Sequence, residues 1–149
     1  MIIVTDTREQ NPYSFSKWDV EVQTGTLPTG DYSLAGLEDV VAIERKNVDD
    51  LIACFMGDNR KRFERELSRA RSYELFAVVV ESSLTDIGRG RYKSNMQPHA
   101  ALQSLAAFFV RYSVPFMCCG SRRAAEYMTY SLLAKYLYEL EKQEQCKAK

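Results

Sequence analysis

An apolar run at residues 40–43, Val-Val-Ala-Ile, constrains the fold most because it passes directly into Glu44, Arg45 and Lys46. A β-branched apolar run predicts a buried strand. Successive residues of a strand face opposite sides, so Glu44 and Lys46 share one face and Arg45 faces the other. Buried strands seldom carry three charges in a row, and these side chains are therefore expected to have specific partners.

The segment before this strand supplies one such partner. "LPTGDYSL" at 27–34 contains Pro28 and Gly30, which favour a turn, and a second strand is expected to begin near Asp31. Only the turn "GLED" separates the two strands, and this spacing predicts an antiparallel hairpin. Asp31 would then lie across the hairpin from Glu44.

The remaining sequence alternates between strand and helix patterns, without an internal repeat. Further strands are expected at 2–5, 20–24, 75–81 and 114–119, and helices at 47–57, 58–73, 98–112 and from 121 to about 141, with a loop at 82–97. This order predicts a single α/β domain at 1–143, with a central mixed sheet flanked by helices. The polar residues 144–149 are expected to be a disordered tail.

Composition limits the class of protein. The chain has 149 residues, 46% of them hydrophobic, and no net charge, which indicates a globular domain without a global electrostatic field. The four cysteines form no Cys-x-x-Cys pair, so buried free thiols are expected rather than a zinc or redox motif. No signal peptide is evident, and no apolar stretch reaches the roughly 18 residues of a membrane helix. An intracellular location is expected, in cytoplasm, nucleoid or, in a eukaryote, nucleus, with no membrane partner.

Acidic residues are expected to meet at the end of the hairpin. Asp6 directly follows the first strand, and Asp50 begins the helix after Lys46, so both can approach Asp31 and Glu44. Converging carboxylates repel one another unless a cation holds them, and oxygen ligands suit Mg²⁺ or Mn²⁺. A lysine beside such a metal is typical of phosphodiester hydrolysis. A surface network of ion pairs is the alternative interpretation.

Three motifs carry a resemblance to a known family. "TDTRE" at 5–9, "LPTGDYSL" and "IERKNVDDL" at 43–51 resemble, in order, the motifs of the XPF-type structure-specific nucleases, and the similarity extends over essentially the whole chain. The resemblance implies the restriction-endonuclease-like fold of the PD-(D/E)XK class. It implies that Asp31 and Glu44 bind the metal and that Lys46 is catalytic.

The same resemblance assigns further positions. Asp6 and Asp50 match the family's other acids, which makes them candidate metal ligands. Asp6 and Arg45 are also candidate catalytic residues, in addition to Asp31, Glu44 and Lys46. Arg8 and Glu9 also match motif positions. The usual serine after the lysine is Asn47 here; because both residues cap helices, this departure is expected to be harmless.

The resemblance also implies a function. Such nucleases cut DNA at flaps, forks and bubbles during repair or recombination and usually act as dimers, so a homodimer or a heterodimer is expected. Many carry a tandem helix-hairpin-helix domain, which is not expected in this chain. The alternative is a non-catalytic or partner-dependent DNA-binding subunit that has kept the nuclease fold.

DNA contacts are expected from two basic segments and from the first motif. Residues 58–72 hold six basic residues against three acidic ones, and the glycine-containing loop at 88–93 adds arginines, a lysine and a tyrosine. A solvated helix face with internal ion pairs remains the alternative for the helical segment. The candidate DNA-binding residues are Arg8, Arg60, Arg62, Arg89, Arg91, Tyr92 and Lys93.

Overall fold

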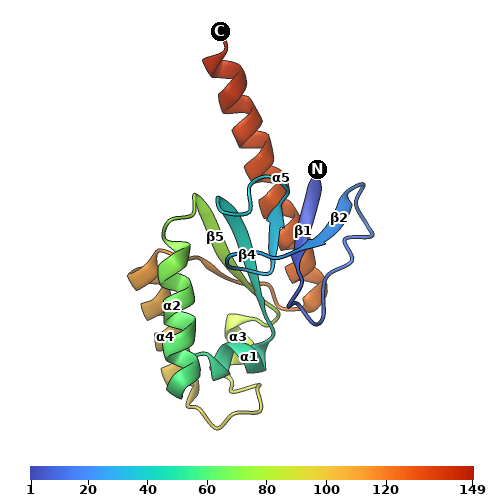
Figure 1. Cartoon of the computed structure of the whole chain (residues 1–149). Helices are drawn as coiled ribbons and strands as arrows, with labels where there is room; N and C mark the ends of the chain where they lie inside the picture. The colour runs from blue at the N-terminus through green and yellow to red at the C-terminus, as the bar shows by residue number, and fades with distance from the viewer.

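The computed structural model describes all 149 residues and contains one mixed six-stranded sheet (Figure 1). The strands lie in the order β2-β1-β3-β4-β5-β6. β3 runs antiparallel to both of its neighbours, whereas the pairs β1–β2, β4–β5 and β5–β6 are parallel. The predicted mixed sheet and the predicted hairpin are confirmed. The strand bounds are β1 Ile2–Asp6, β2 Glu21–Gly25, β3 Tyr32–Leu34, β4 Val41–Lys46, β5 Leu75–Val80 and β6 Phe116–Cys118.

Five helices cover the sheet. α2 and α4 lie against one face and α5 against the other, with the end of α5 extending beyond the body of the protein (Figure 1). Their bounds are α1 Val48–Ala53, α2 Gly57–Ala70, α3 Leu84–Gly88, α4 Pro98–Tyr112 and α5 Arg122–Lys147.

Local chemistry explains where three of these helices begin. The side chain of Asn47 accepts a hydrogen bond from the backbone N–H of Asp50 at 2.8 Å, which caps α1 as predicted. Ser121 caps α5 in the same way through the N–H of Ala124. Pro98 occupies the first turn of α4, where its missing N–H costs nothing.

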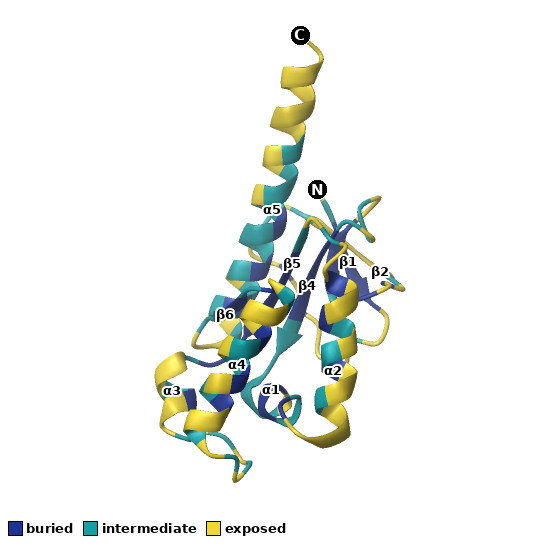
Figure 2. Cartoon of the chain, turned by 90° about the vertical axis from the view of Figure 1, so that its left-hand side faces the viewer, coloured by how far each residue is buried: buried dark blue, intermediate teal, exposed yellow.

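Three predicted boundaries are corrected. The expected loop at 82–97 contains the short helix α3, which Ser83 caps by accepting from the N–H of Asp86. α2 ends at Ala70, before the expected end at 73. α5 continues past 141 to Lys147 because no glycine or proline interrupts its polar end. Its last turns are exposed (Figure 2), and a disordered tail at 144–149 stays a prediction.

The core is divided by the sheet into two layers. Ala42 of β4 packs with α1, α2 and α4, whereas Val41 and Ile43 pack with α5 and with the segment that follows β1. β1, β3, β4 and β5 are mostly buried, whereas the edge strand β2 is largely exposed (Figure 2). The alternation continues past Ile43, so Glu44 and Lys46 extend the α2 face and Arg45 extends the α5 face.

No helix combines the length and the apolar character required to cross a bilayer. All four cysteines are free; Cys146 is exposed and the other three are partly buried, less than the buried thiols that were expected.

Gly30 allows the chain to enter β3 against β4. Its φ is +82°, and a Cβ atom there would lie 2.8 Å from the Cβ of Ala42. Gly36, in the turn at the other end of the hairpin, has a similar φ of +84° but no atom within 4 Å of such a Cβ.

We therefore expect Gly30→Ala to destabilise the protein more than Gly36→Ala. Both variants incur the cost of a left-handed backbone, about 1–2 kcal/mol, and Gly30→Ala adds overpacking of about 1–3 kcal/mol. Urea unfolding followed by circular dichroism measures both. Equal losses in the two variants would show that the close approach to Ala42 is unimportant.

Candidate active site

The backbone of the hairpin fixes Asp31 next to the end of β4. The Asp31 N–H donates to the carbonyl of Ile43 at 2.9 Å, and the Asp31 carbonyl accepts from the N–H of Asp6 at 2.8 Å. The Arg45 N–H donates to Asp31 Oδ2 at 2.8 Å. Asp31 is therefore held between β1 and β4, as the sequence predicted.

Glu44 and Lys46 meet on the α2 face. Lys46 Nζ lies 3.1 Å from Glu44 Oε1 and 5.2 Å from the centre of the Phe63 ring. The Glu44 side chain is 9% exposed and that of Lys46 is 17% exposed. The predicted shared face is confirmed, and the ion pair is largely shielded from water.

Asp31 and Glu44 line a cavity of about 220 Å³ that opens between the hairpin and α2. Asp6 and Arg8 lie at its β1 side. α2 contributes a charged stripe, Arg62, Glu66 and Arg69, whose spacing places all three on one helix face. The cavity is thus lined by four acids and three arginines.

The acids in this cavity repel one another. Burial raises the pKa of Asp31 to about 7; the Arg45 N–H and Lys46 oppose the shift, while Glu9 and Glu66 add to it. Burial, followed by the charges of Asp31 and Glu66, raises the pKa of Glu44 well above its usual range. Burial and neighbouring acids thus disfavour the charged form of both carboxyl groups, and a bound cation would offset this.

Lys46 keeps its proton. Burial, the largest single effect, lowers the pKa of its ammonium, but Glu44 together with Cys54 and Glu66 outweighs burial, so the net shift of the pKa is upward. At neutral pH the group is a cation that can stabilise an anion or donate a proton.

Glu66 belongs to the cavity and was not identified from the sequence as a site residue. Its carboxyl group lies within hydrogen-bonding reach of Glu44, and its Oε1 is 3.4 Å from the hydroxyl of Thr29. The available signal was the buried stripe of Phe63 and Leu67, which Glu66 adjoins on the same helix. Recognising it required knowing that α2 packs beside the end of β4.

Asp6 is already fully hydrogen-bonded. Its Oδ1 accepts from the N–H and Nε of Arg8, and its Oδ2 accepts from Arg8 Nη2 and the N–H of Leu27, all at 2.8–3.0 Å. Burial raises its pKa, but these hydrogen bonds outweigh burial and lower the pKa overall. Asp6 therefore orients Arg8, whose side chain is 68% exposed at the cavity.

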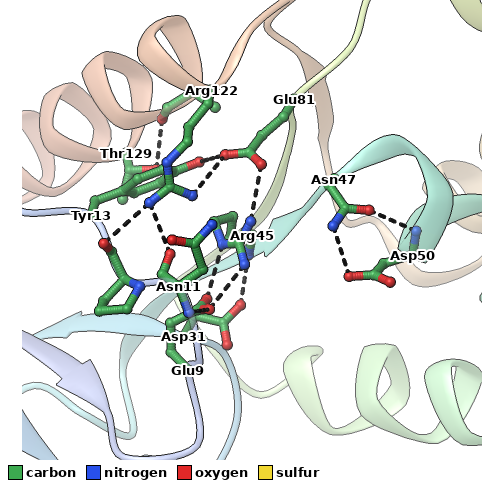
Figure 3. Close-up of polar contacts among 12 residues, drawn as sticks. Glu9, Asn11, Tyr13, Asp31, Arg45, Asn47, Asp50, Glu81, Arg122 and Thr129 are labelled. Carbon is green, nitrogen blue, oxygen red and sulfur yellow. Dashed lines mark hydrogen bonds and ion pairs between the residues drawn. The ribbon is translucent and has the colours of Figure 1, made fainter.

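Asp50 lies in an adjoining cavity of about 240 Å³ that Lys46 also lines. Its Oδ2 accepts from the side-chain amide of Asn47 at 3.0 Å (Figure 3). Arg62 and Glu66 line both cavities and separate them. The structure therefore brings Asp6, Asp31 and Glu44 together and places Asp50 on the far side of Lys46.

Arg45 points away from the cavity into a buried charge network (Figure 3). Its guanidinium donates to Glu9 at 2.9 and 3.0 Å and to Glu81 at 2.9 Å, and only 10% of its side chain is exposed. Tyr13 and Arg122 also contact Glu81, at 2.7 and 3.5 Å. Arg45 touches the site through its backbone N–H alone.

The candidate DNA-binding arginines Arg8, Arg60 and Arg62 differ in whether their side chains are already engaged by other residues. Arg8 and Arg62 are exposed at the cavity. Arg60 is held internally: its Nη1 donates to the Phe55 carbonyl and to the Ser104 hydroxyl at 3.1 Å each, and its guanidinium stacks over Phe108. Arg60 ties α2 to α4.

The predicted DNA-binding loop lies beside α1. The Lys93 N–H donates to Asp49 of α1 at 2.9 Å, and Arg91 forms an exposed ion pair with Asp86. Tyr92 packs against the core and its hydroxyl donates to the Met96 carbonyl at 2.6 Å, so its ring is not free to stack on a base. Arg89 and Lys93 have exposed side chains.

The donor set suits a hard divalent cation. No group of three or more histidine, cysteine or acidic side chains is close enough to hold a metal ion alone. Mg²⁺ commonly takes only one or two carboxylates, with waters and substrate phosphates completing its shell. Asp31 and Glu44 provide two carboxylates that line one cavity and whose charge is disfavoured by burial, so they fit such an ion.

We expect Asp31→Asn to raise the free energy of unfolding in metal-free buffer at pH 8. Because the folded-state pKa of Asp31 is about 7 and its ordinary value is 3.8, the folded protein binds the extra proton, and stability falls as pH rises between these values. Asp31→Asn lacks this pH-dependent loss, so its free energy of unfolding at pH 8 should exceed that of the wild type by roughly 1–4 kcal/mol. The gain should disappear near pH 4; urea titrations at both pH values measure it. A variant less stable than wild type at pH 8 would contradict the repulsion.

The chain is similar to a known domain in sequence and to solved structures in fold. Residues 5–132 match the ERCC4 domain. The structure of XPF from Aeropyrum pernix superposes with a TM-score of 0.73 at 21% identity, covering 91% of this chain and 61% of that one. A second structure, XPF from Aeropyrum pernix in complex with DNA, gives a TM-score of 0.68 at 23% identity and covers 93% of this chain and 66% of that one. The chain spans about two thirds of the length of these structures or slightly less, and no curated protein matches it in sequence.

The likeness to these structures confirms the predicted restriction-endonuclease-like fold. The family match covers most of the chain, including both strands of the hairpin and the stripe of α2. The chain belongs to the ERCC4 domain family, the XPF-type nuclease domains.

Proposed function

We propose that the protein is a Mg²⁺- or Mn²⁺-dependent DNA endonuclease that hydrolyses phosphodiester bonds at branched structures such as flaps and forks, in repair or recombination. The observation that carries this proposal is the buried corner where Asp31 and Glu44 face each other beside the protonated Lys46. Buried carboxyl groups with raised pKa values that line a cavity are typical of functional sites, which supports the proposal.

Asp31 and Glu44 would hold the metal, with Glu66 beside Glu44 as a further acid on α2. The bound ion would supply a more acidic water and neutralise charge on the phosphate. That Asp6 and Asp50 are ligands stays a prediction, since the first is engaged by Arg8 and the second lies in the adjoining cavity.

The other residues would bind and orient the substrate. Lys46 would place its ammonium at the scissile phosphate, where charge increases in the transition state. Arg8, Arg62 and Arg69 line the cavity and would contact neighbouring phosphates. Arg45 would act as a positioning residue because its N–H holds Asp31 while its side chain anchors β4 to Glu9 and Glu81. Arg60, Arg89, Arg91, Tyr92 and Lys93 stay candidates for DNA contact.

DNA as the substrate is supported by the family and by the XPF of Aeropyrum pernix, whose structure is known in complex with DNA. Assembly as a homodimer, or as a heterodimer with a related chain, is supported by exposed apolar side chains on α4: Phe109 and Val110 are 43% and 80% exposed. We include an intracellular location in the proposal because the substrate is found there.

Cleavage of labelled flap, fork, nicked and plain duplex DNA with Mg²⁺ or Mn²⁺ tests the proposal. We expect metal-dependent cutting by the wild type and a loss of at least about 100-fold in Asp31→Asn and Glu44→Gln, as removal of several kcal/mol of transition-state stabilisation implies. Asp39→Asn is the matched control, since Asp39 is an exposed acid in the turn at the other end of the same hairpin. It should cut like the wild type.

Two other outcomes are informative. Binding of the same DNAs without cutting would favour a non-catalytic or partner-dependent subunit. Neither binding nor cutting, or equal cutting by Asp31→Asn and wild type, would contradict the proposed active site.

A further inference from the structure

An aromatic cluster lies on the α5 face, on the opposite side of the sheet from the cavity described above. The ring of Trp18 stacks on that of Tyr130, with centroids 4.5 Å apart and planes at 13°. Tyr127 lies one helical turn away; its ring centre is 6.3 Å from that of Trp18 and its side chain is exposed. Trp18 is the only tryptophan of the chain.

Trp18 and Tyr127 border a cavity of about 400 Å³ between the segment at 17–18 and the first turns of α5. No acidic residue lines this cavity. Lys17 and Arg123 lie at it, both exposed and both without an ion-pair partner. Glu126, on the same helix, is engaged by the N–H of Phe15 at 2.8 Å. The cavity therefore combines aromatic surface with two cations that form no ion pair, while the acids Asp19 and Glu126 lie outside its lining.

The start of α5 adds to this charge. Ser121 caps the helix and also lines the cavity, and the first turn contains no acidic residue. The positive end of the helix dipole therefore remains available to an anion. The helix end alone would not define a ligand; with the two cations and the aromatic rings it favours a polyanion that carries flat groups.

Single-stranded DNA has this chemistry. Its unpaired bases can stack on exposed aromatic rings while its phosphates contact lysine and arginine. In duplex DNA the bases are stacked inside the helix, so a duplex would offer only its phosphates to this cavity. An apolar peptide would use the rings and leave both cations without partners. The combination of features thus selects a single strand.

The cavity is placed to receive an arm of a branched substrate. Ser121 follows β6 beyond its last residue, and Glu44 and Lys46 end β4; because β4, β5 and β6 are parallel, the Ser121 side of the cavity and the active site lie toward the same edge of the sheet, whereas Trp18 precedes the start of β2. They lie on opposite faces, since α5 covers one and α2 the other (Figure 1). A strand that leaves the duplex at the active site would pass around this edge.

We propose that the cavity at Lys17, Trp18, Arg123 and Tyr127 binds the single-stranded arm of the DNA substrate, with a base against the rings and a phosphate at the two cations. The inference rests on the proposed nuclease function. It assigns the preference for branched over plain duplex DNA to this cavity and not to the catalytic carboxylates.

Fluorescence of Trp18 tests the inference directly, because no other tryptophan contributes. In buffer with EDTA, a single-stranded oligothymidylate of about 15 residues should quench the emission with saturation, and an armless duplex of equal length should not. Tyr127→Ala should weaken binding of the oligothymidylate about 5- to 100-fold, the range measured for a stacked base. Lys17→Ala with Arg123→Ala should lower the slope of log affinity against log salt by about 1.4. Tyr138→Ala is the matched control, since Tyr138 is on the same helix and both tyrosines are 57% exposed.

A cleavage assay separates failure of this inference from failure of the proposed function. With Mg²⁺, Tyr127→Ala should lose preference for flap over plain duplex DNA while it still cuts. If flap DNA is cut, but Trp18 is not quenched and Tyr127→Ala keeps its preference, the inference is wrong and the nuclease function stands. Equal quenching by duplex DNA would overturn the single-strand assignment. A change of emission with protein concentration, without DNA, would show that a second copy of the chain covers the cavity and would also overturn it.

Discussion

The interaction on which the rest of this structure depends is the repulsion between the buried carboxyl groups of Asp31 and Glu44. Burial raises both pKa values; the charges of Asp31 and Glu66 add to the rise at Glu44, those of Glu9 and Glu66 add to the rise at Asp31, and the ammonium of Lys46 opposes both. The surrounding fold keeps the two acids together in spite of this cost: the hairpin backbone fixes Asp31, the pleat of β4 directs Glu44 to the same side, and α2 closes the corner with Glu66, an additional acid. Corners of this kind store unfavourable charge that a divalent cation relieves. In the proposed nuclease, the same feature that weakens the metal-free fold would give the site its chemistry.

The side chains of Glu44, Arg45 and Lys46 alternate between the two faces of the sheet. Glu44 and Lys46 continue the α2 face, where Glu44 lines the cavity and Lys46 lines the adjoining one, whereas Arg45 continues the α5 face and is held by Glu9 and Glu81. Since the Arg45 N–H also bonds to Asp31, the network on one face fixes the backbone that orients the carboxylate on the other. The α5 face then carries Trp18 and Tyr127 toward the same edge. Chemistry and recognition of a single strand would thus be separated by one layer of strands.

The sequence predicted the parts of the site that depend on local pairing. The hairpin, the shared face of Glu44 and Lys46, the helix caps and the position of Asp6 beside Asp31 follow from turn residues and strand alternation, and the structure contains them. Glu66 was not predicted because its place in the cavity depends on how α2 packs against the end of β4. Periodicity could not separate Arg62, which faces the cavity, from Arg60, which bonds to α4. Nor could it show that Tyr92 packs inward or that Asp6 is engaged by Arg8. Side-chain partners distant in sequence decide these points, and no local pattern encodes them.

Calorimetric titration of the protein with Mn²⁺ at pH 8 tests the central claim most directly, because it asks whether the repelling carboxylates bind a cation without requiring that they cut anything. The account predicts saturable binding to the wild type, weakened at least about tenfold in both Asp31→Asn and Glu44→Gln, as loss of one of two carboxylate ligands implies. Binding of equal strength in the wild type and in both variants would show that these carboxylates are not the metal site.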